Sequence, residues 1–285
     1  MTATIAFLGC GEMSEAIMAG LLDSGIPADR VLATVRSPER AALLARRYAV
    51  SLAASAEDSD ANARAAARAD VVVLGVKPDQ IRGVAEEIAV SLRPDTVVVS
   101  VAGAIPLSTI EGALPAGQPV VRAMPNTPVR AGFGVTAVVG GAHASGETLQ
   151  RVSALFATVG LVVEVGEDQI DAVGTVSGSG PAYVFYLAEA MAEAGKRLGL
   201  PADLARTLAT HTVAGAGRLL DGDADPAALR RAVCSPNGST ERAIAAFEER
   251  GLRGVVAAGA AAAEARAKEI TRQLAGDSAR PEGDR

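Results

Sequence analysis

The sequence of 285 residues predicts an α/β domain followed by an all-helical domain. Three observations predict this division. A short apolar run at residues 5–8 ends at a Gly-x-Gly turn and is followed by helical spacing. Further apolar runs alternate with helical segments up to about residue 165, and only helical periodicity is found from Asp168 onward.

The turn after the first strand is the most informative segment. Gly9 permits a tight turn after Leu8, and Gly11 lets a phosphate approach the backbone without meeting a Cβ. The helix that follows, to about Leu22, offers unpaired N–H groups and its dipole to a pyrophosphate. Ser14 stands where this fingerprint prefers Gly or Ala. An ordinary βα turn is the alternative, but the flanking strand and helix favour a dinucleotide site.

The other elements of the first domain alternate in order. Apolar runs predict strands at residues 31–35, 71–74, 96–101, 119–123, 134–139 and 161–165, and helical spacing predicts helices at 38–48, 62–69, 81–92 and 147–159. This alternation indicates a Rossmann-type dinucleotide-binding domain over residues 1–165. Because ligands bind at the carboxyl ends of such strands, we expect cofactor contacts from the segments that follow them, which include Gly75, Val76, Lys77, Pro78, Ala102 and Gly103.

The end of the second strand bears on the choice of cofactor. An acidic residue there would bind the ribose hydroxyls of NAD, but no Asp or Glu lies between Val31 and Pro38. Arg36 and Ser37 occupy this position and suit the additional phosphate of NADP. A solvated surface arginine is the other interpretation of Arg36. We therefore expect NADPH as cofactor, with NADH as the alternative.

The second domain is predicted over residues 166–275, with helices at 182–198, 201–220, 226–233, 239–250 and 252–274. Residues 276–285 are polar and contain Pro and Gly, which predicts a disordered tail. The helices are rich in Ala and other small residues and are not expected to bury their apolar faces alone. We therefore expect a homodimer formed through the C-terminal helices.

Composition excludes several classes of function. The net charge is −6 and no Lys/Arg run is present, so we expect no nucleic-acid partner. Cys10 and Cys234 lie in no metal-ligand or Cys-x-x-Cys pattern, which argues against a metal site and favours a reduced cytosolic compartment. The apolar N-terminus lacks a basic flank, and the Ala-rich segment 255–263 is too short to span a bilayer, so we expect no membrane partner.

A second motif lies between two predicted helices, from Ser235 to Thr240. Its hydroxyl groups, together with free N–H groups at the start of the helix that follows, would bind a carboxylate. A helix N-cap without further function is the alternative.

Five short motifs, in this order, resemble the pyrroline-5-carboxylate reductase family over essentially the full chain. They are residues 7–13 (FLGCGEM), 76–78 (VKP), 124–128 (MPNTP), 177–183 (SGSGPAY) and 233–240 (VCSPNGST). The resemblance implies NAD(P)H-dependent reduction of 1-pyrroline-5-carboxylate to L-proline, the last step of proline biosynthesis. It also implies a helical domain that interlocks with that of a second subunit, and dimers that can assemble into decamers.

The resemblance also implies roles for individual residues. Cofactor contacts are expected from Leu8, Gly9, Cys10, Gly11, Glu12, Met13, Arg36, Ser37, Asn62, Gly75, Val76, Lys77, Pro78, Ala102 and Gly103. Substrate contacts are expected from Ser235, Gly238, Ser239, Thr240 and, by a looser match, Glu167. Two positions depart from the family pattern: Asn237 replaces a usual Gly, and Ala232 stands where the family has a cofactor-contacting Asn. Asn tolerates a positive φ better than most residues, which makes the first departure compatible with the loop.

The expected chemistry needs little acid–base assistance. A protonated cyclic imine accepts hydride readily, so the protein must mainly orient the reactants. His143 and His211 lie in a polar loop and inside a helix, and neither is a convincing base. Thr240 is the candidate catalytic residue, through a hydrogen bond to the ring nitrogen. Two other functions stay open: a reductase of another imine or a β-hydroxyacid, and a non-catalytic protein that senses NADP.

Overall fold

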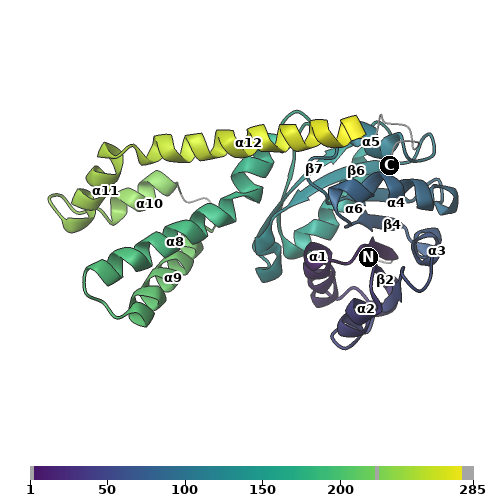
Figure 1. Ribbon diagram of the computed structural model, residues 1–285, viewed down its shortest axis with the longest axis horizontal. Coiled ribbons are helices and arrows are strands. Elements are labelled where there is room, and N and C mark those ends of the chain that lie inside the picture. The colour runs from purple at the N-terminus through teal and green to yellow at the C-terminus, as the bar shows by residue number, and fades with distance from the viewer. Residues whose placement is uncertain (1–2, 222–224, 278–285) are drawn as a thin grey trace. The chain divides into compact units, whose positions relative to one another are not determined.

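A computed structural model describes residues 3–221 and 225–277 (Figure 1). The chain forms two compact units. The first unit comprises Met1–Gly178 with Glu264–Arg285, and the second comprises Ser179–Ala263. The domain boundary expected at residue 165 stays a prediction. Of the predicted tail, residues 276 and 277 end the last helix, and 278–285 lie outside the described residues.

The first unit is built on one sheet of eight strands in the order β3-β2-β1-β4-β5-β6-β7-β8. The strands are β1 (Ile5–Leu8), β2 (Val31–Val35), β3 (Ser51–Ala54), β4 (Val71–Leu74), β5 (Val97–Ser100), β6 (Val120–Pro125), β7 (Gly134–Gly140) and β8 (Gly160–Glu164). All neighbours are parallel except β6 and β7. The strand order reverses at β1 and β4, which confirms the Rossmann-type prediction.

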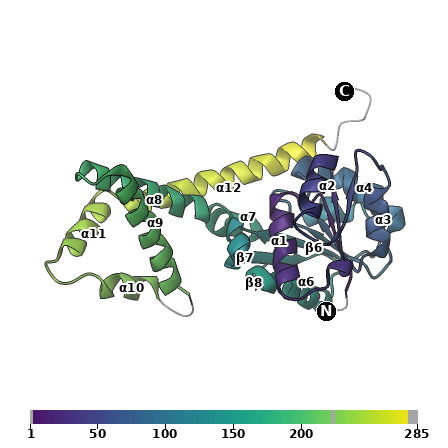
Figure 2. The same cartoon turned by 90° about the horizontal axis from the view of Figure 1, so that it is seen from below.

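Helices cover both faces of this sheet (Figure 2). They are α1 (Glu12–Asp23), α2 (Pro38–Ala45), α3 (Ala61–Arg68), α4 (Ile81–Ile88), α5 (Leu107–Glu111), α6 (Gly146–Phe156) and α7 (Ile170–Val173). Successive residues of β1 point to opposite faces: Phe7 packs with Ile17 of α1 and Phe156 of α6, whereas Leu8 packs with Ile81 of α4. Because helices bury both faces of the sheet, the side chains on both faces of these strands are apolar, and the strands are continuous apolar runs.

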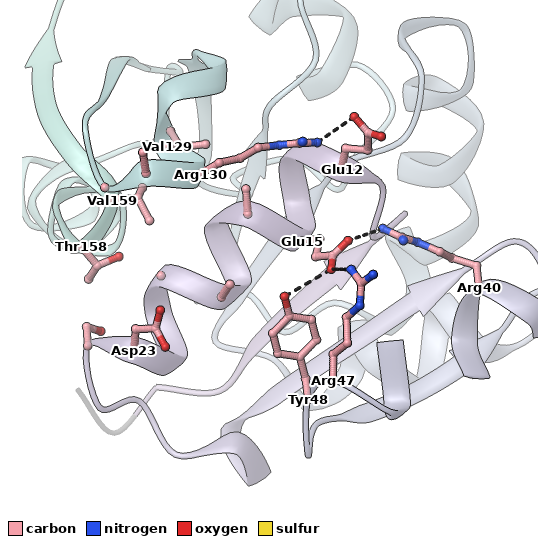
Figure 3. A pocket seen from close by; sticks show the side chains of 16 residues that line it. Glu12, Glu15, Asp23, Arg40, Arg47, Tyr48, Val129, Arg130, Thr158 and Val159 are labelled. Carbon is pink, nitrogen blue, oxygen red and sulfur yellow. Dashed lines mark hydrogen bonds and ion pairs between the residues drawn. The ribbon is translucent and has the colours of Figure 1, made fainter. Parts of the chain in front are cut away.

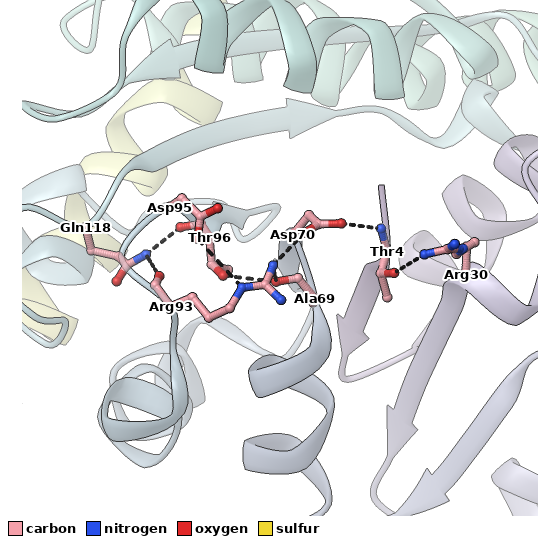
Figure 4. A network of polar contacts seen from close by, with 8 residues as sticks. All are labelled: Thr4, Arg30, Ala69, Asp70, Arg93, Asp95, Thr96 and Gln118. Carbon is pink, nitrogen blue, oxygen red and sulfur yellow. Dashed lines mark hydrogen bonds and ion pairs between the residues drawn. The ribbon is translucent and has the colours of Figure 1, made fainter. Parts of the chain in front are cut away.

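A polar network ties together the amino ends of four neighbouring strands, β1, β4, β5 and β6 (Figure 4). Asp70, just before β4, accepts a hydrogen bond from the backbone of Thr4 at 2.7 Å. Arg93 donates to the carbonyl of Ala69 at 3.0 Å and pairs with Asp70, while Gln118 donates to the carbonyl of Arg93 at 3.1 Å. This end of the sheet is therefore closed by its own side chains, and the opposite, carboxyl ends are left for a ligand.

The Gly- and Ser-rich segment around Ser177 comes directly before the helix predicted to begin at residue 182. A π-helical turn, Gly174–Gly178, follows α7 and precedes α8 (Gly180–Arg197) almost without a break. Thr175 donates its hydroxyl to the carbonyl of Asp171 within this turn. Gly and Ser, which usually mark loops, are tolerated here because the turn is short and continues into a long helix. Pro181 lies in the first turn of α8, as predicted.

The second unit contains only helices among its described residues. They are α8, α9 (Ala202–Leu219), α10 (Pro226–Ala232), α11 (Ser239–Glu249) and the start of α12 (Leu252–Asp277), whose later part belongs to the first unit. Ala205 and Ala209 of α9 are buried, but large apolar side chains of α8 are exposed, namely Val184, Phe185, Tyr186 and Leu187. These residues lie around the helix, and exposed large apolar side chains of this kind favour contact with a partner surface. None of the described helices has the length and apolarity of a bilayer span.

Candidate active site

A pocket of about 880 Å³ opens at the carboxyl ends of β1, β2 and β4. This volume is in the range of small-molecule and cofactor sites. It brings together nine of the fifteen residues predicted to contact the cofactor, which are Gly9, Cys10, Gly11, Arg36, Ser37, Asn62, Gly75, Val76 and Lys77. These residues are far apart in the sequence. The parallel pairing of β1 with β2 and with β4 brings them together.

The other six predicted contacts do not line this pocket. Leu8 is buried in the sheet, Glu12 and Met13 begin α1, and Pro78 begins a short 3₁₀ turn. Ala102 and Gly103 follow β5, in a loop whose next residue, Ala104, has a φ of +62°. Thr271 of α12 donates its hydroxyl to the carbonyl of Ala104 at 3.1 Å. The cofactor contacts expected from these six residues stay predictions.

The backbone of the glycine turn is held in place by β2. Thr34 accepts from the Gly9 N–H through its hydroxyl at 3.3 Å and from the Cys10 N–H through its carbonyl at 2.7 Å. Gly9 has a φ of +83°, which a side chain would disfavour. A Cβ built on Gly11 meets no atom within 4 Å, so open space faces this residue. The turn thus fits a pyrophosphate at the start of α1.

Cys10, between these glycines, is buried and uncharged. Burial is the largest influence on its thiol and raises the pKa to about 12, which Arg40 opposes only in part. Its side chain is therefore a small apolar filler beneath the turn rather than a nucleophile. Ser14, the departure from the glycine fingerprint, packs against Gly75, and its buried hydroxyl has no hydrogen-bond partner among the described residues.

The end of β2 lies at this pocket, and the contact of Arg36 and Ser37 with a second phosphate stays a prediction. Arg36 is exposed at the pocket, and its guanidinium forms no hydrogen bond within the described chain. Ser37 caps α2, accepting from the Arg40 N–H at 3.3 Å, so the start of this helix also faces the pocket. Sequence reasoning missed Ser55 and Ser59, which line the same pocket after β3. The polar segment 55–59 (SAEDS) is the signal that could have indicated them.

Glu167, the loosely matched substrate residue, is engaged within the first unit. Its Oε1 accepts from the Leu107 N–H at 3.1 Å and from Arg122 at 3.0 Å. Arg122 is 5% exposed in β6, and Asp171 lies 3.8 Å from its other terminal nitrogen. Glu167 therefore holds the start of α5 and a buried charge, and its contact with substrate stays a prediction.

The second sequence motif forms the loop between α10 and α11. Gly238 precedes α11 and provides no side-chain cap, and within the described chain the N–H groups of Ser239 and Thr240 form no hydrogen bond. Asn237 has a φ of +61°, and its N–H donates to Glu241 at 2.7 Å. Asn237 thus adopts the positive φ that Asn tolerates better than most residues. Ser235 lies in this loop and Ser239 and Thr240 lie in the first turn of α11, and all three are exposed.

Comparisons with known proteins identify the family. The pyrroline-5-carboxylate reductase of Pseudomonas aeruginosa is 39% identical over 275 residues, which cover 96% of this chain and 98% of that protein. The enzyme of the same name from Escherichia coli is 36% identical over 258 residues, covering 90% of this chain and 94% of that one. The chain belongs to the pyrroline-5-carboxylate reductase family. A reductase of this family reduces a cyclic imine with NAD(P)H, so the chain is an NADP-dependent oxidoreductase.

Family models and solved structures agree with this assignment. The model described as pyrroline-5-carboxylate reductase dimerisation matches residues 167–270 of the reductase, and an NADP oxidoreductase model described as coenzyme F420-dependent matches residues 4–104. The Coxiella burnetii pyrroline-5-carboxylate reductase superposes with a TM-score of 0.87 at 36% identity, covering 95% of this chain and 99% of that one. The Plasmodium falciparum enzyme, solved with NADP bound, shares the fold at 24% identity and a TM-score of 0.80. The dimerisation domain indicates that the reductase forms homo-oligomers.

A second pocket, of about 830 Å³, lies beside α1 of the reductase (Figure 3). Glu15 is its most connected side chain. It accepts from Arg40 at 2.6 Å, from Arg47 at 2.9 Å and from the hydroxyl of Tyr48 at 3.2 Å. Arg40 also lies 3.5 Å from the Cys10 carbonyl, so this cluster links α2 to the glycine turn.

Replacing Glu15 by Gln is expected to lower the free energy of unfolding at pH 7 by about 1–3 kcal/mol, because two arginines lose a charged acceptor. Burial alone raises the pKa of the Glu15 carboxyl, but hydrogen bonds from Arg40 and Arg47 outweigh it and lower the pKa. Since the folded pKa is the lower one, the stabilisation is complete above the ordinary value of about 4.3 and is lost as pH falls through the folded pKa. Urea unfolding of the wild type and of Glu15→Gln from pH 7 to pH 3 measures the difference in their free energies of unfolding.

Glu12 provides the matched control. It pairs with Arg130 at 2.7 Å, but its side chain is 84% exposed. The Glu12→Gln variant should therefore change stability by less than about 0.5 kcal/mol at any pH. A stability difference between the wild type and Glu15→Gln that does not shrink on acidification would contradict the role given to the Glu15 charge.

Proposed function

We propose that this reductase converts 1-pyrroline-5-carboxylate to L-proline with NADPH, as the last step of proline biosynthesis, in the cytoplasm. Membership of the family supports the reaction. The observation on which the cofactor assignment rests is the end of β2, where Arg36 and the start of α2 face a pocket and no acidic residue lies between the strand and the helix. We further propose a homodimer through the C-terminal helices, which assembles into a decamer; the exposed apolar side chains of α8 support the dimer.

The residues of the chain have defined tasks in this reaction. The glycine turn, with Lys77 and Asn62, holds the dinucleotide, and Arg36 and Ser37 hold its additional phosphate. NADPH, when bound, supplies the hydride that the imine carbon accepts. The free N–H groups of Ser239 and Thr240 bind the substrate carboxylate at the start of α11.

The nitrogen side of the reaction is assigned to Thr240. Its hydroxyl oxygen accepts a hydrogen bond from the N–H of the iminium, which holds the protonated ring nitrogen in place while hydride reduces the C=N bond to C–N. Neither His143 nor His211 lines either pocket, which is consistent with a reaction that needs orientation more than a base.

The decisive experiment is the loss of 340 nm absorbance on adding pyrroline-5-carboxylate to the purified protein with NADPH, and then with NADH. Fast oxidation that prefers NADPH is expected. A preference for NADH would remove the assigned role of Arg36. No oxidation with either cofactor, in a folded protein that binds the dinucleotide, would favour another imine or hydroxyacid substrate, or an NADP sensor.

Replacing Thr240 by Ala is expected to lower kcat by about tenfold, since one hydrogen bond to a charged group is lost. The dissociation constant for NADPH should not change, because Thr240 is not part of the dinucleotide pocket. Thr240→Ser keeps the hydroxyl and should restore most of the turnover. Steady-state kinetics of the three proteins measure this, and an unchanged kcat in Thr240→Ala would remove Thr240 from the mechanism.

A further inference from the structure

Glu87 is the one acidic residue among the described residues that line the dinucleotide pocket. The pocket otherwise presents three cationic side chains, Arg36, Arg40 and Lys77, together with hydroxyls and backbone N–H groups. A ligand with several phosphates suits the cationic groups and would be repelled by a carboxylate. The carboxylate of Glu87, an exposed residue at the pocket wall, therefore suits a part of the ligand that carries no phosphate.

A chain of hydrogen bonds connects Glu87 to the glycine turn. Its Oε2 accepts from the side-chain amide of Asn62 at 3.1 Å. The Oδ1 of Asn62 accepts from the hydroxyl of Thr34 at 2.6 Å, and that hydroxyl in turn accepts from the Gly9 N–H at 3.3 Å. Thr34 and Asn62 are 2% and 8% exposed, so the bond between them is shielded from water, whereas Glu87 is exposed.

This chain fixes which atoms remain for a ligand. Because Thr34 holds the oxygen of Asn62, the amide nitrogen must point toward Glu87, and one of its two N–H groups stays available. Oε1 of Glu87 accepts from no residue in the described part of the chain. This end of the pocket therefore offers one free strong acceptor next to one free donor.

The wall around this pair is suited to a flat ring. Glu87 lies in the last turn of α4, and Gly83 and Val84 of the same helix also line the pocket. A Cβ on Gly83 would meet no atom within 4 Å, so the helix surface is open and has no side chain there. An adenine ring presents an exocyclic amino donor beside a ring-nitrogen acceptor, which complements a carboxylate beside an amide N–H.

We propose that Glu87 makes the reductase select 6-aminopurine dinucleotides over 6-oxopurine dinucleotides, with Oε1 accepting from the exocyclic amino group and Asn62 donating to the adjacent ring nitrogen. A 6-oxopurine places a carbonyl oxygen and a ring N–H at these two positions. The carbonyl then faces a carboxylate and the N–H faces a donor, so both contacts become repulsive. The inference rests on the proposed function of the pocket as the NADPH site.

The test compares binding of NADP⁺ with binding of its hypoxanthine analogue, by isothermal titration calorimetry of the intact oligomer. The wild type should bind NADP⁺ at least about tenfold more tightly. In Glu87→Gln the new amide can donate to the carbonyl of hypoxanthine, and the preference should fall to about threefold or less. Steady-state kinetics with the reduced forms should show the same fall in the ratio of the two KM values.

Glu86 provides the control. It is the preceding residue of α4, pairs with Arg82 at 2.8 Å and does not line the pocket, so Glu86→Gln should keep the wild-type preference. Equal weakening of both ligands in Glu87→Gln would show a purely structural role and overturn the proposal. A change in the preference for NADP⁺ over NAD⁺, without a change between the two bases, would place Glu87 at the ribose and would also overturn it.

Failure of the proposed function gives a different result. If the pocket is not the NADPH site, neither NADP⁺ nor its analogue binds to the wild type with micromolar affinity. In that case, substitutions in the pocket do not change the dissociation constant of either ligand. If the pocket is the NADPH site but Glu87 does not contact the base, both ligands bind to the wild type with similar dissociation constants.

Discussion

Replacing Gly9 by Ala is expected to lower the free energy of unfolding by about 3 kcal/mol and to weaken NADPH binding by at least about 100-fold. The φ of +83° costs an alanine about 1–2 kcal/mol. The added Cβ would also overlap Cγ1 of Val76 and lie 2.9 Å from the Val76 backbone nitrogen, and overpacking of this kind costs about 1–3 kcal/mol. Because both Gly9 and Val76 line the pocket, relief of this overlap must displace the turn that holds the pyrophosphate.

Gly25 separates the two contributions. It has a φ of +92°, but a Cβ built there meets no atom within 4 Å, and the residue lies beyond the end of α1. Gly25→Ala should therefore lose only about 1–2 kcal/mol of stability and keep its affinity for NADPH. Urea unfolding and titration of NADPH fluorescence give both quantities. Weakened NADPH binding in Gly25→Ala, or intact binding in Gly9→Ala, would show that the overlap with Val76 does not control the site.

The sheet of the first unit was largely predictable because its central strands are buried on both faces. Runs such as Val71-Val72-Val73-Leu74 admit few other structures, and each predicted strand is present. β3 was missed because Ser51–Ala54 is a short edge strand, half exposed and without β-branched residues. Ser55 and Ser59 were missed with it, since only the pairing of β3 with β2 brings them to Arg36.

Glu87 shows a different limit of sequence reasoning. Helical spacing places Ile81, Ala85 and Ile88 on the buried face of α4, as the structure confirms. It does not determine which of the polar residues of that helix faces a pocket, because the pocket is formed by distant segments. The short helices α5 and α7 were missed for a related reason, since four or five residues are too few to show a helical period.

The second large effect is expected at Arg36. Replacing it by Leu should raise the KM for NADPH by about 10- to 100-fold, because a charge-assisted hydrogen bond to phosphate contributes about 1.5–3 kcal/mol. The KM for NADH should change by less than about threefold, since NADH has no phosphate at this position. The guanidinium forms no hydrogen bond within the described residues, so its removal breaks no structural contact. Steady-state kinetics with NADPH and with NADH measure the two changes in KM.

The control for this variant is Arg46→Leu. Arg46 follows α2, is exposed and lines neither pocket, so its replacement removes the same charge without touching the site. A rise in the KM for NADPH shared by both variants would indicate a long-range effect of net charge, which added salt would screen. A rise confined to Arg36→Leu would show that a local contact selects NADPH. Equal effects of Arg36→Leu on NADPH and NADH would instead place the guanidinium at the pyrophosphate, and the preference for NADPH would then have to come from Ser37, Ser55 and Ser59.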